Sequence, residues 1–149
     1  SYHLLREEVV VCVHRYHPYA KKRSCMISEL LAEPLVQFQE GYYMRKVIDD
    51  LAFKEGVVPI VVAESNLPSL LSSMVKEELG LAFLPKMATG NDPDIVKVSC
   101  DPSIYIDLSI TWKRDSPLSP ANRAFVDFLI QEVDDYYMLA RAASTFPLP

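Results

Sequence analysis

The order of apolar and polar positions along the chain predicts alternating strands and helices. Residues 9–13 are a β-branched apolar block, typical of a strand that is buried on both faces. From Met44 to Ala52 the apolar residues recur with the spacing of an amphipathic helix, which Gly56 is expected to end. Further strands are predicted at residues 35–38, 57–63 and 81–84, and a second amphipathic helix at residues 67–75. This alternation is typical of an α/β fold with helices packed on a sheet.

Shorter elements and a long C-terminal helix complete the prediction. Ser28 is expected to cap a helix of one to two turns. Residues 104–112 alternate strictly between apolar and polar, which predicts a strand with one buried face. Ser119 is expected to cap a long helix with Pro120 at its first position, and residues 146–149 are expected to be frayed. The apolar stripe of the long helix is predicted to contain Ala121, Ala124, Phe125, Phe128, Leu129 and Val133.

Composition narrows the class of protein. The 149 residues include 20 Asp and Glu against 15 Lys and Arg, a formal charge of −5, and 50% of them are hydrophobic. This is the balance of one globular domain, and its acidic surface is poorly suited to holding DNA or RNA. The four glycines are too dispersed for a phosphate-binding loop. Three cysteines without paired spacing favour a reducing cytoplasm, and no apolar run approaches the about 20 residues of a membrane span.

Metal binding and catalysis find little support in the sequence. Cys12, His14 and His17 lie within six residues, but no fourth ligand follows with zinc-like spacing. The interpretation preferred here is a strand that packs one thiol, followed by two histidines near a surface turn, so no metal and no cofactor are expected. Paired carboxylates such as Asp49 and Asp50 lie on polar sides or ends of predicted helices, where solvation explains them. We therefore do not expect an enzyme.

Binding of a small ligand has a better physical basis. In open α/β sheets, ligands bind beyond the carboxyl ends of strands, where the following helices begin with unpaired N–H groups and a partial positive charge. Two predicted junctions have this arrangement. The candidate site residues are Gln39, Tyr42, Tyr43 and Met44 at the first junction, and Glu64, Ser65 and Asn66 at the second. The alternative for the second junction is that Ser65 and Asn66 only cap a helix.

Five segments in the same order resemble the effector-binding domain of LysR-type transcriptional regulators. They are His17-Pro18, ISELLAEPLVQF, RKVIDDLAFKEGVVPIVVAES, MVKEELGLAFLP and LSITWKRDSPLSPANRAFVDFL. The similarity extends from about His14 to Leu129, and its most telling parts are LGLAFLP and the run from Trp112 to Phe125. By position, both ligand-binding junctions match segments of the family that face the effector.

The resemblance implies a type II periplasmic-binding-protein-like fold, with a mixed sheet, helices on both of its faces and an effector between two α/β lobes. Residues 14–110 would be the second lobe, residues 1–13 a crossover strand from a truncated first lobe, and residues 111–149 the return crossover and C-terminal helix. One departure is that Glu78 stands where the family often has glycine. A non-glycine residue adopts a positive φ only at some cost, so the turn there is expected to differ.

The expected function is therefore ligand sensing by a cytoplasmic, DNA-binding regulator. Its partners are expected to be a small effector, such as a carboxylate, and further copies of the protein. DNA would be bound only by a domain absent from this chain, and no membrane partner is expected. The alternative is a solute-binding protein of a transport system, which shares the fold.

Overall fold

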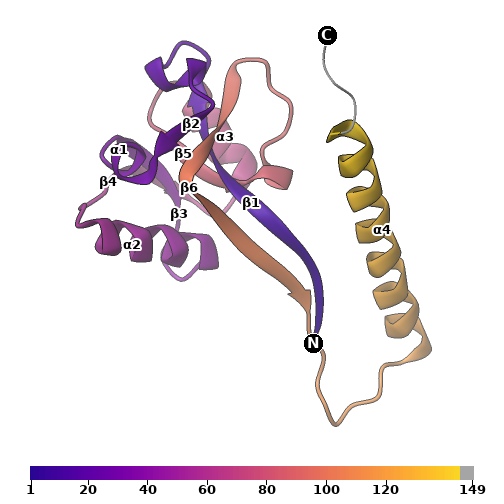
Figure 1. Cartoon of the computed structure of the whole chain (residues 1–149). Coiled ribbons are helices and arrows are strands. Elements are labelled where there is room, and N and C mark those ends of the chain that lie inside the picture. Colours follow the sequence, from indigo (N-terminus) through magenta and orange to yellow (C-terminus); the bar gives the residue numbers. More distant parts are fainter. Residues whose placement is uncertain (145–149) are drawn as a thin grey trace. The chain divides into compact units, whose positions relative to one another are not determined.

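The computed structural model describes residues 1–144, with side chains through residue 139. The frayed end expected at residues 146–149 lies outside the described residues. The chain divides into two compact units (Figure 1). The larger unit contains residues 7–106, and the smaller contains residues 1–6 and 107–149. Two long strands belong partly to each unit.

The elements alternate as the sequence predicts. The strands are β1 (Tyr2–His14), β2 (Ser24–Met26), β3 (Pro34–Phe38), β4 (Ile60–Ser65), β5 (Ala82–Pro85) and β6 (Ile95–Ile110). The α-helices are α1 (Ile27–Leu31), α2 (Tyr43–Glu55), α3 (Pro68–Lys76) and α4 (Pro120–Ser144), and two short 3-10 helices are η1 (Pro18–Lys21) and η2 (Lys86–Ala88).

The strands form a mixed sheet in two parts. One part has the order β2-β6-β1-β5, and the other is the pair β3-β4. β1 and β5 are antiparallel, whereas β2 pairs in parallel with β6 and β3 pairs in parallel with β4. A single parallel bridge between Leu35 and Leu81 joins the two parts. The mixed α/β sheet predicted from the sequence is confirmed.

The hydrophobic core lies in the larger unit. Its centre is β1, where every residue from Val9 to Val13 is buried because the strand has a neighbour on each side. The helix α3 contacts β3, β4 and β5, while α2 contacts β3 and α1. The fully buried large side chains include Leu30, Leu31, Leu35, Leu71, Leu84, Val36, Val75 and Val98.

The structure confirms some of the predicted ends of helices and strands and differs from others. Gly56 ends α2 in the left-handed conformation, at φ 68°, and the Ser119 hydroxyl accepts a hydrogen bond from the Asn122 N–H at 3.2 Å, as a capping residue does. Ser28 does not cap α1, because β2 leads directly into the helix and Met26 takes the capping position. The strand β4 begins only at Ile60, and its first residues alternate between exposed and partly buried because it packs on one face alone.

In the smaller unit, the helix α4 lies with the outer ends of β1 and β6. The Tyr137 hydroxyl accepts a hydrogen bond from the Arg6 N–H at 2.9 Å. The predicted apolar stripe is confirmed in part: Leu129 and Val133 are partly buried, whereas Ala121, Ala124, Phe125 and Phe128 are exposed. The buried position of the helix is Val126, which the predicted stripe omitted.

Gly80 is the glycine whose missing side chain matters most to the fold. A Cβ atom at this position would lie 2.6 Å from the Pro34 carbonyl oxygen, closer than any real contact. The next residue is hydrogen-bonded to β3 on both sides, because the Leu81 N–H donates to Pro34 O and the Val36 N–H donates to Leu81 O, each at 2.9 Å. Only glycine lets the two backbones approach this closely.

We expect Gly80→Ala to lower the free energy of unfolding by at least about 2 kcal/mol, because the added Cβ must push β5 away from β3. Gly56→Ala is the matched control. Its added Cβ has no neighbouring atom within 4 Å, so the variant has only the cost of a left-handed φ, about 1 kcal/mol. Urea unfolding of the two variants checks this. A Gly80→Ala variant as stable as Gly56→Ala would contradict the prediction.

Candidate functional site

The two ligand-binding junctions predicted from the sequence lie side by side. The parallel register pairs Phe38 with Ser65 and Gln37 with Glu64, so β3 and β4 end at the same edge of the sheet. The first residues after each strand therefore leave the sheet close together. This is the edge at which open α/β sheets bind ligands.

Arg45, in the first turns of α2, ties the two strand ends together. Its Nη1 donates a hydrogen bond to the Phe38 carbonyl oxygen at 3.0 Å and another to Glu64 Oε1 at 2.7 Å. Its Nε donates to Asp49 Oδ2, one turn further along the helix, at 2.8 Å. A single planar guanidinium thus connects β3, β4 and α2, which suits its fixed fork of donors.

The Arg45 side chain is only 11% exposed. Burial by itself lowers its pKa, but the hydrogen bonds to Glu64 and Asp49 and the charges of these carboxylates outweigh that effect, so its pKa is raised above the usual value. The Arg45 guanidinium is therefore held charged at this edge. It neutralises Glu64, which is consequently not a free carboxylate for a ligand.

The predicted site residues divide into exposed and buried ones. Gln39, Tyr42, Tyr43, Glu64 and Asn66 are exposed, whereas Met44 and Ser65 are buried. The two tyrosines line a surface cavity of about 620 Å³ together with Glu40, Gly41, Arg45, Lys46, Asp49 and Asp50, and no residue of the second junction lines it. The structure thus brings the two junctions together at one edge without placing all seven residues in one cavity.

Met44 and Ser65 have structural positions. Met44 packs in the hydrophobic core beside Ile48. The Ser65 hydroxyl accepts a hydrogen bond from the Leu67 N–H at 3.1 Å, which shapes the turn between β4 and α3. Ser65 and Asn66 do not cap α3, because Leu67 occupies the capping position and Pro68 begins the helix.

Two features of this edge were not found from the sequence. Arg45 is one, although its spacing of four from Asp49 was a visible signal. The other is Gln37, whose side chain is buried and whose Nε2 has no hydrogen-bond partner among the described residues. The helix α2 adds further donors, since Tyr42 at its capping position supplies no side-chain acceptor for the first N–H groups.

The cysteine and histidines near the end of β1 are not arranged as metal ligands. Burial raises the pKa of the Cys12 thiol to about 11, so the thiol stays protonated. His14 Nδ1 accepts a hydrogen bond from the Tyr16 N–H, and His17 Nδ1 accepts one from the Tyr19 N–H. No group of three or more possible ligands within residues 1–144 is placed to hold a metal ion.

Comparison with known proteins identifies the family. The family model described as LysR substrate binding domain matches residues 1–134. The uncharacterized HTH-type transcriptional regulator YwbI of Bacillus subtilis (strain 168) is 33% identical over 130 residues, which are 85% of this chain and 43% of that protein. The transcriptional dual regulator GltC of the same organism is 25% identical over 131 residues, 86% of this chain and 44% of that protein.

Solved structures have the same fold. The regulatory domain of CcmR from Synechocystis PCC6803, solved in complex with 2-PG, has a TM-score of 0.73 at 20% identity, and the match covers 87% of this chain and 64% of that one. The effector binding domain of QuiR, in complex with shikimate, has a TM-score of 0.72 at 21% identity, with 90% and 65% covered.

The chain therefore belongs to the LysR substrate-binding, or effector-binding, domain family. Its fold is the type II periplasmic-binding-protein-like fold, and its family is one of regulatory domains rather than enzymes. The chain spans less than half the length of the curated relatives named above. As for membranes, none of the helices in residues 1–144 has the length and apolar character to cross a bilayer.

We expect Arg45→Met to lower the free energy of unfolding by about 2 kcal/mol, because it leaves the Glu64 carboxylate and the Phe38 carbonyl without their donor. Lys46→Met is the matched control, since it breaks only the exposed pair with Asp50 one turn along the same helix. Urea unfolding at neutral pH measures both variants. Equal stability of the two would show that Arg45 does not hold the strand ends together.

Proposed function

We propose that the chain is the effector-sensing part of a bacterial DNA-binding transcription regulator, and that its effector binds at the shared end of β3 and β4. The observation that carries this proposal is the meeting of both strand ends with the start of α2, joined by Arg45. Occupation of the site would favour one arrangement of the whole regulator over another and so alter its action on DNA.

A small carboxylate is the effector that suits this edge. The first N–H groups of α2 have no side-chain cap, and a helix N-terminus carries a partial positive charge. Arg45 offsets the negative charge of Glu64 nearby. Tyr42 and Tyr43 are exposed beside this helix end and would contact the body of the ligand.

The rest of the regulator would complete the site. In this proposal residues 14–110 form the second effector-binding lobe, while residues 1–13 and 111–149 lead from and to the first. The compact unit of residues 7–106 supports this division. The exposed Phe125 and Phe128 on α4 are an apolar surface that further chain of the first lobe would cover. DNA would be bound by a domain outside this chain, in the cytoplasm.

A solute-binding protein of a transport system is the alternative function. The curated relatives favour the regulator, because YwbI and GltC are both named as transcriptional regulators. The gene decides between the two functions. A helix-turn-helix encoded upstream of this chain supports the regulator, whereas a secretion signal in that place would exclude it.

The effector site predicts a specific behaviour for Tyr42→Asp. The new carboxylate would occupy the first N–H groups of α2 itself, so the variant should be more stable by about 1 kcal/mol and should bind small carboxylates at least about tenfold more weakly. Titration of the ¹⁵N-labelled protein with shikimate and with a panel of mono- and dicarboxylates, followed through the amide signals of Tyr43 and Met44, measures the affinities.

Met26→Asp is the control for this experiment. It places the same carboxylate at the capping position of α1, which also lacks a side-chain cap. We expect this variant to bind carboxylates as the unmodified protein does. The proposal fails if no carboxylate gives saturable shifts, or if Tyr42→Asp binds as tightly as Met26→Asp.

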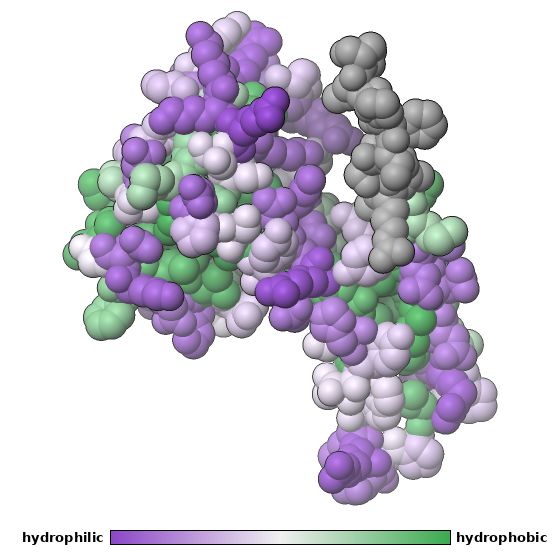
Figure 2. Space-filling view, viewed as in Figure 1, coloured by the Kyte–Doolittle hydropathy of each residue, from purple (hydrophilic) through white to green (hydrophobic). Residues whose placement is uncertain are grey.

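Self-association through β4 is the second part of the proposal. Within the described residues β4 pairs only with β3, so its other edge has unpaired backbone groups. Ile60 and Val62 on this strand are 59% and 48% exposed, and Phe53 and Val58 just before it are almost fully exposed. Figure 2 shows apolar surface on the side where α2 and β4 lie. A second copy of the chain, with the same edge, fits this surface.

We expect Ile60→Lys to weaken the dimer at least about tenfold, because a charge on an exposed strand edge opposes pairing. Met87→Lys is the control, as it changes an equally exposed apolar side chain far from β4 in the sequence. Sedimentation velocity over a concentration series gives the dissociation constants. A monomer at all concentrations, or the same constant for both variants, would refute the β4 interface.

A further inference from the structure

Two of the three buried cysteines lie opposite each other on neighbouring strands. In the parallel register of β2 and β6, Cys25 and Cys100 are direct Cα partners. Both side chains belong to the hydrophobic core cluster, whereas both neighbours of Cys25 in the chain are exposed. Residues of a strand alternate between the two faces of a sheet, so both thiols point into the core from the same face. The third cysteine, Cys12 in β1, has Ala82 as its partner in β5.

The spacing of the two strands suits a metal ion between the thiols better than a disulfide. Neighbouring strands lie about 4.7–4.9 Å apart, and Cα–Cβ bonds that point to the same face keep a similar separation between the two Cβ atoms. A disulfide needs its Cβ atoms about 3.8 Å apart, so it would require the strands to move. Two metal–thiolate bonds of about 2.3 Å, arranged in line, span about 4.6 Å and match the strand spacing.

The number of available ligands limits the kind of ion. Among the residues that the structure describes, no group of three or more His, Cys, Asp or Glu side chains could hold a metal ion. The pair therefore lacks the further ligands of a tetrahedral zinc site. Two thiolates alone suit a soft ion that binds two ligands in line.

The charge of the surroundings favours a divalent ion. Ser99 Oγ, next to Cys100 in the chain, donates a hydrogen bond to Glu8 Oε1 at 2.9 Å, which places a carboxylate close to the pair. Burial and this carboxylate raise the pKa of the Cys100 thiol to about 12. Two thiolates and one divalent ion form a neutral group, whereas a monovalent ion would leave a net negative charge near Glu8 and in an apolar core.

The pair lies close to the edge of the sheet. The strand β2 is the outermost strand of its part of the sheet, and three residue pairs join it to β6. A short edge strand opens locally at a low free-energy cost, which gives an ion a way in. The Cys100 Sγ lies 3.8 Å from the Val9 carbonyl oxygen, a weak hydrogen bond that the ion would replace.

We propose that Cys25 and Cys100 form a binding site for a soft divalent metal ion of linear coordination, the chemistry of Hg²⁺. Each thiol transfers its proton to water and binds the ion through its sulfur, so two protons are released for each ion. The bound ion joins the edge strand β2 to β6, and with β2 also α1, which follows it directly. This site is independent of the effector edge and of the proposed regulatory function.

Competition with reduced glutathione tests the site, since the thiols of glutathione are not held together. The protein is equilibrated with HgCl₂ in excess glutathione, separated by gel filtration and analysed for mercury and for glutathione. We expect about one ion and no glutathione per chain, because two fixed thiols avoid the entropy cost of collecting two free ones. Cys25→Ala and Cys100→Ala should each retain at least about tenfold less mercury, since each leaves a single thiol at the site.

Cys12→Ala is the matched control, because it removes an equally buried thiol that has no cysteine as its strand partner. This variant should retain the ion as the unmodified protein does. Its X-ray absorption spectrum should show two sulfur ligands at about 2.3 Å. Cys25 and Cys100 are the only thiols left in it, so this spectrum tests the site even if the other two variants do not fold.

Four outcomes would overturn the proposal. They are loss of the ion in Cys12→Ala, a number of sulfur ligands other than two, sedimentation showing that the ion joins two chains, and retention of Zn²⁺ against glutathione where Hg²⁺ is lost.

Discussion

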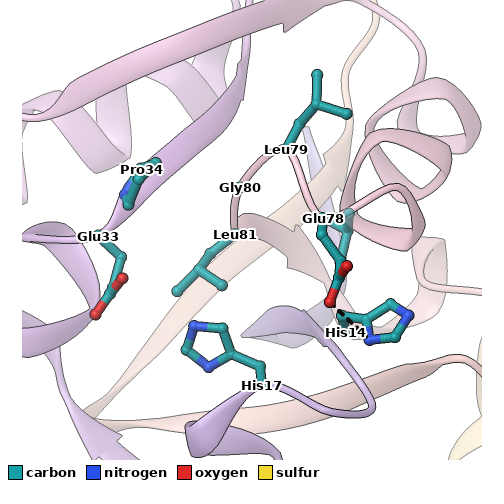
Figure 3. Close-up of a pocket in the computed structure, with 9 residues that line it drawn as sticks. His14, His17, Glu33, Pro34, Glu78, Leu79, Gly80 and Leu81 are labelled. Carbon is teal, nitrogen blue, oxygen red and sulfur yellow. Dashed lines mark ion pairs between the residues drawn. The ribbon is translucent and has the colours of Figure 1, made fainter.

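The close contact between the backbones at Gly80-Leu81 and Pro34-Leu35 is the constraint on which the larger unit depends. Two hydrogen bonds of 2.9 Å and one bridge join the pair β3-β4 to the four-stranded part of the sheet. This contact, together with α3, which contacts β3, β4 and β5, sets the position of the strand ends that carry the proposed effector site. The same contact forms the floor of a cavity of about 190 Å³ at the other end of β3, which His17, Glu33 and Glu78 also line (Figure 3).

Charge pairing shapes the edge of the sheet at which the effector is proposed to bind. Several cations pair with carboxylates, among them Arg45 with Glu64 and Asp49, Lys46 with Asp50, and Lys76 with Asp92. At the edge where β3 and β4 end, Arg45 lies within 3.9 Å of three carboxylates, those of Glu40, Asp49 and Glu64, so it offsets only part of their charge, and the helix N-terminus is the feature that would favour an anion.

Sequence patterns predicted the parts of the fold that depend on local periodicity. The helix from Tyr43 to Glu55 and its end at Gly56 follow directly from apolar spacing and from glycine's freedom at positive φ. The two strand-to-helix junctions were also predicted, because a strand followed by a helix start can be seen in one dimension. The patterns did not give the burial that depends on a tertiary partner: Met44 and Ser65, two of the expected site residues, are buried, and the predicted stripe of α4 omitted Val126.

The sequence by itself determined the family, the order of strands and helices, and the two segments that leave the sheet at the ends of β3 and β4. Only the tertiary structure decided that Arg45 joins those segments and that His17, Glu33 and Glu78 line one cavity. The physical reason is the distance along the sequence over which each interaction acts. Periodicity and capping act within a few residues, whereas these groupings bring together residues that are up to about 60 positions apart, through strand pairing and side-chain hydrogen bonds.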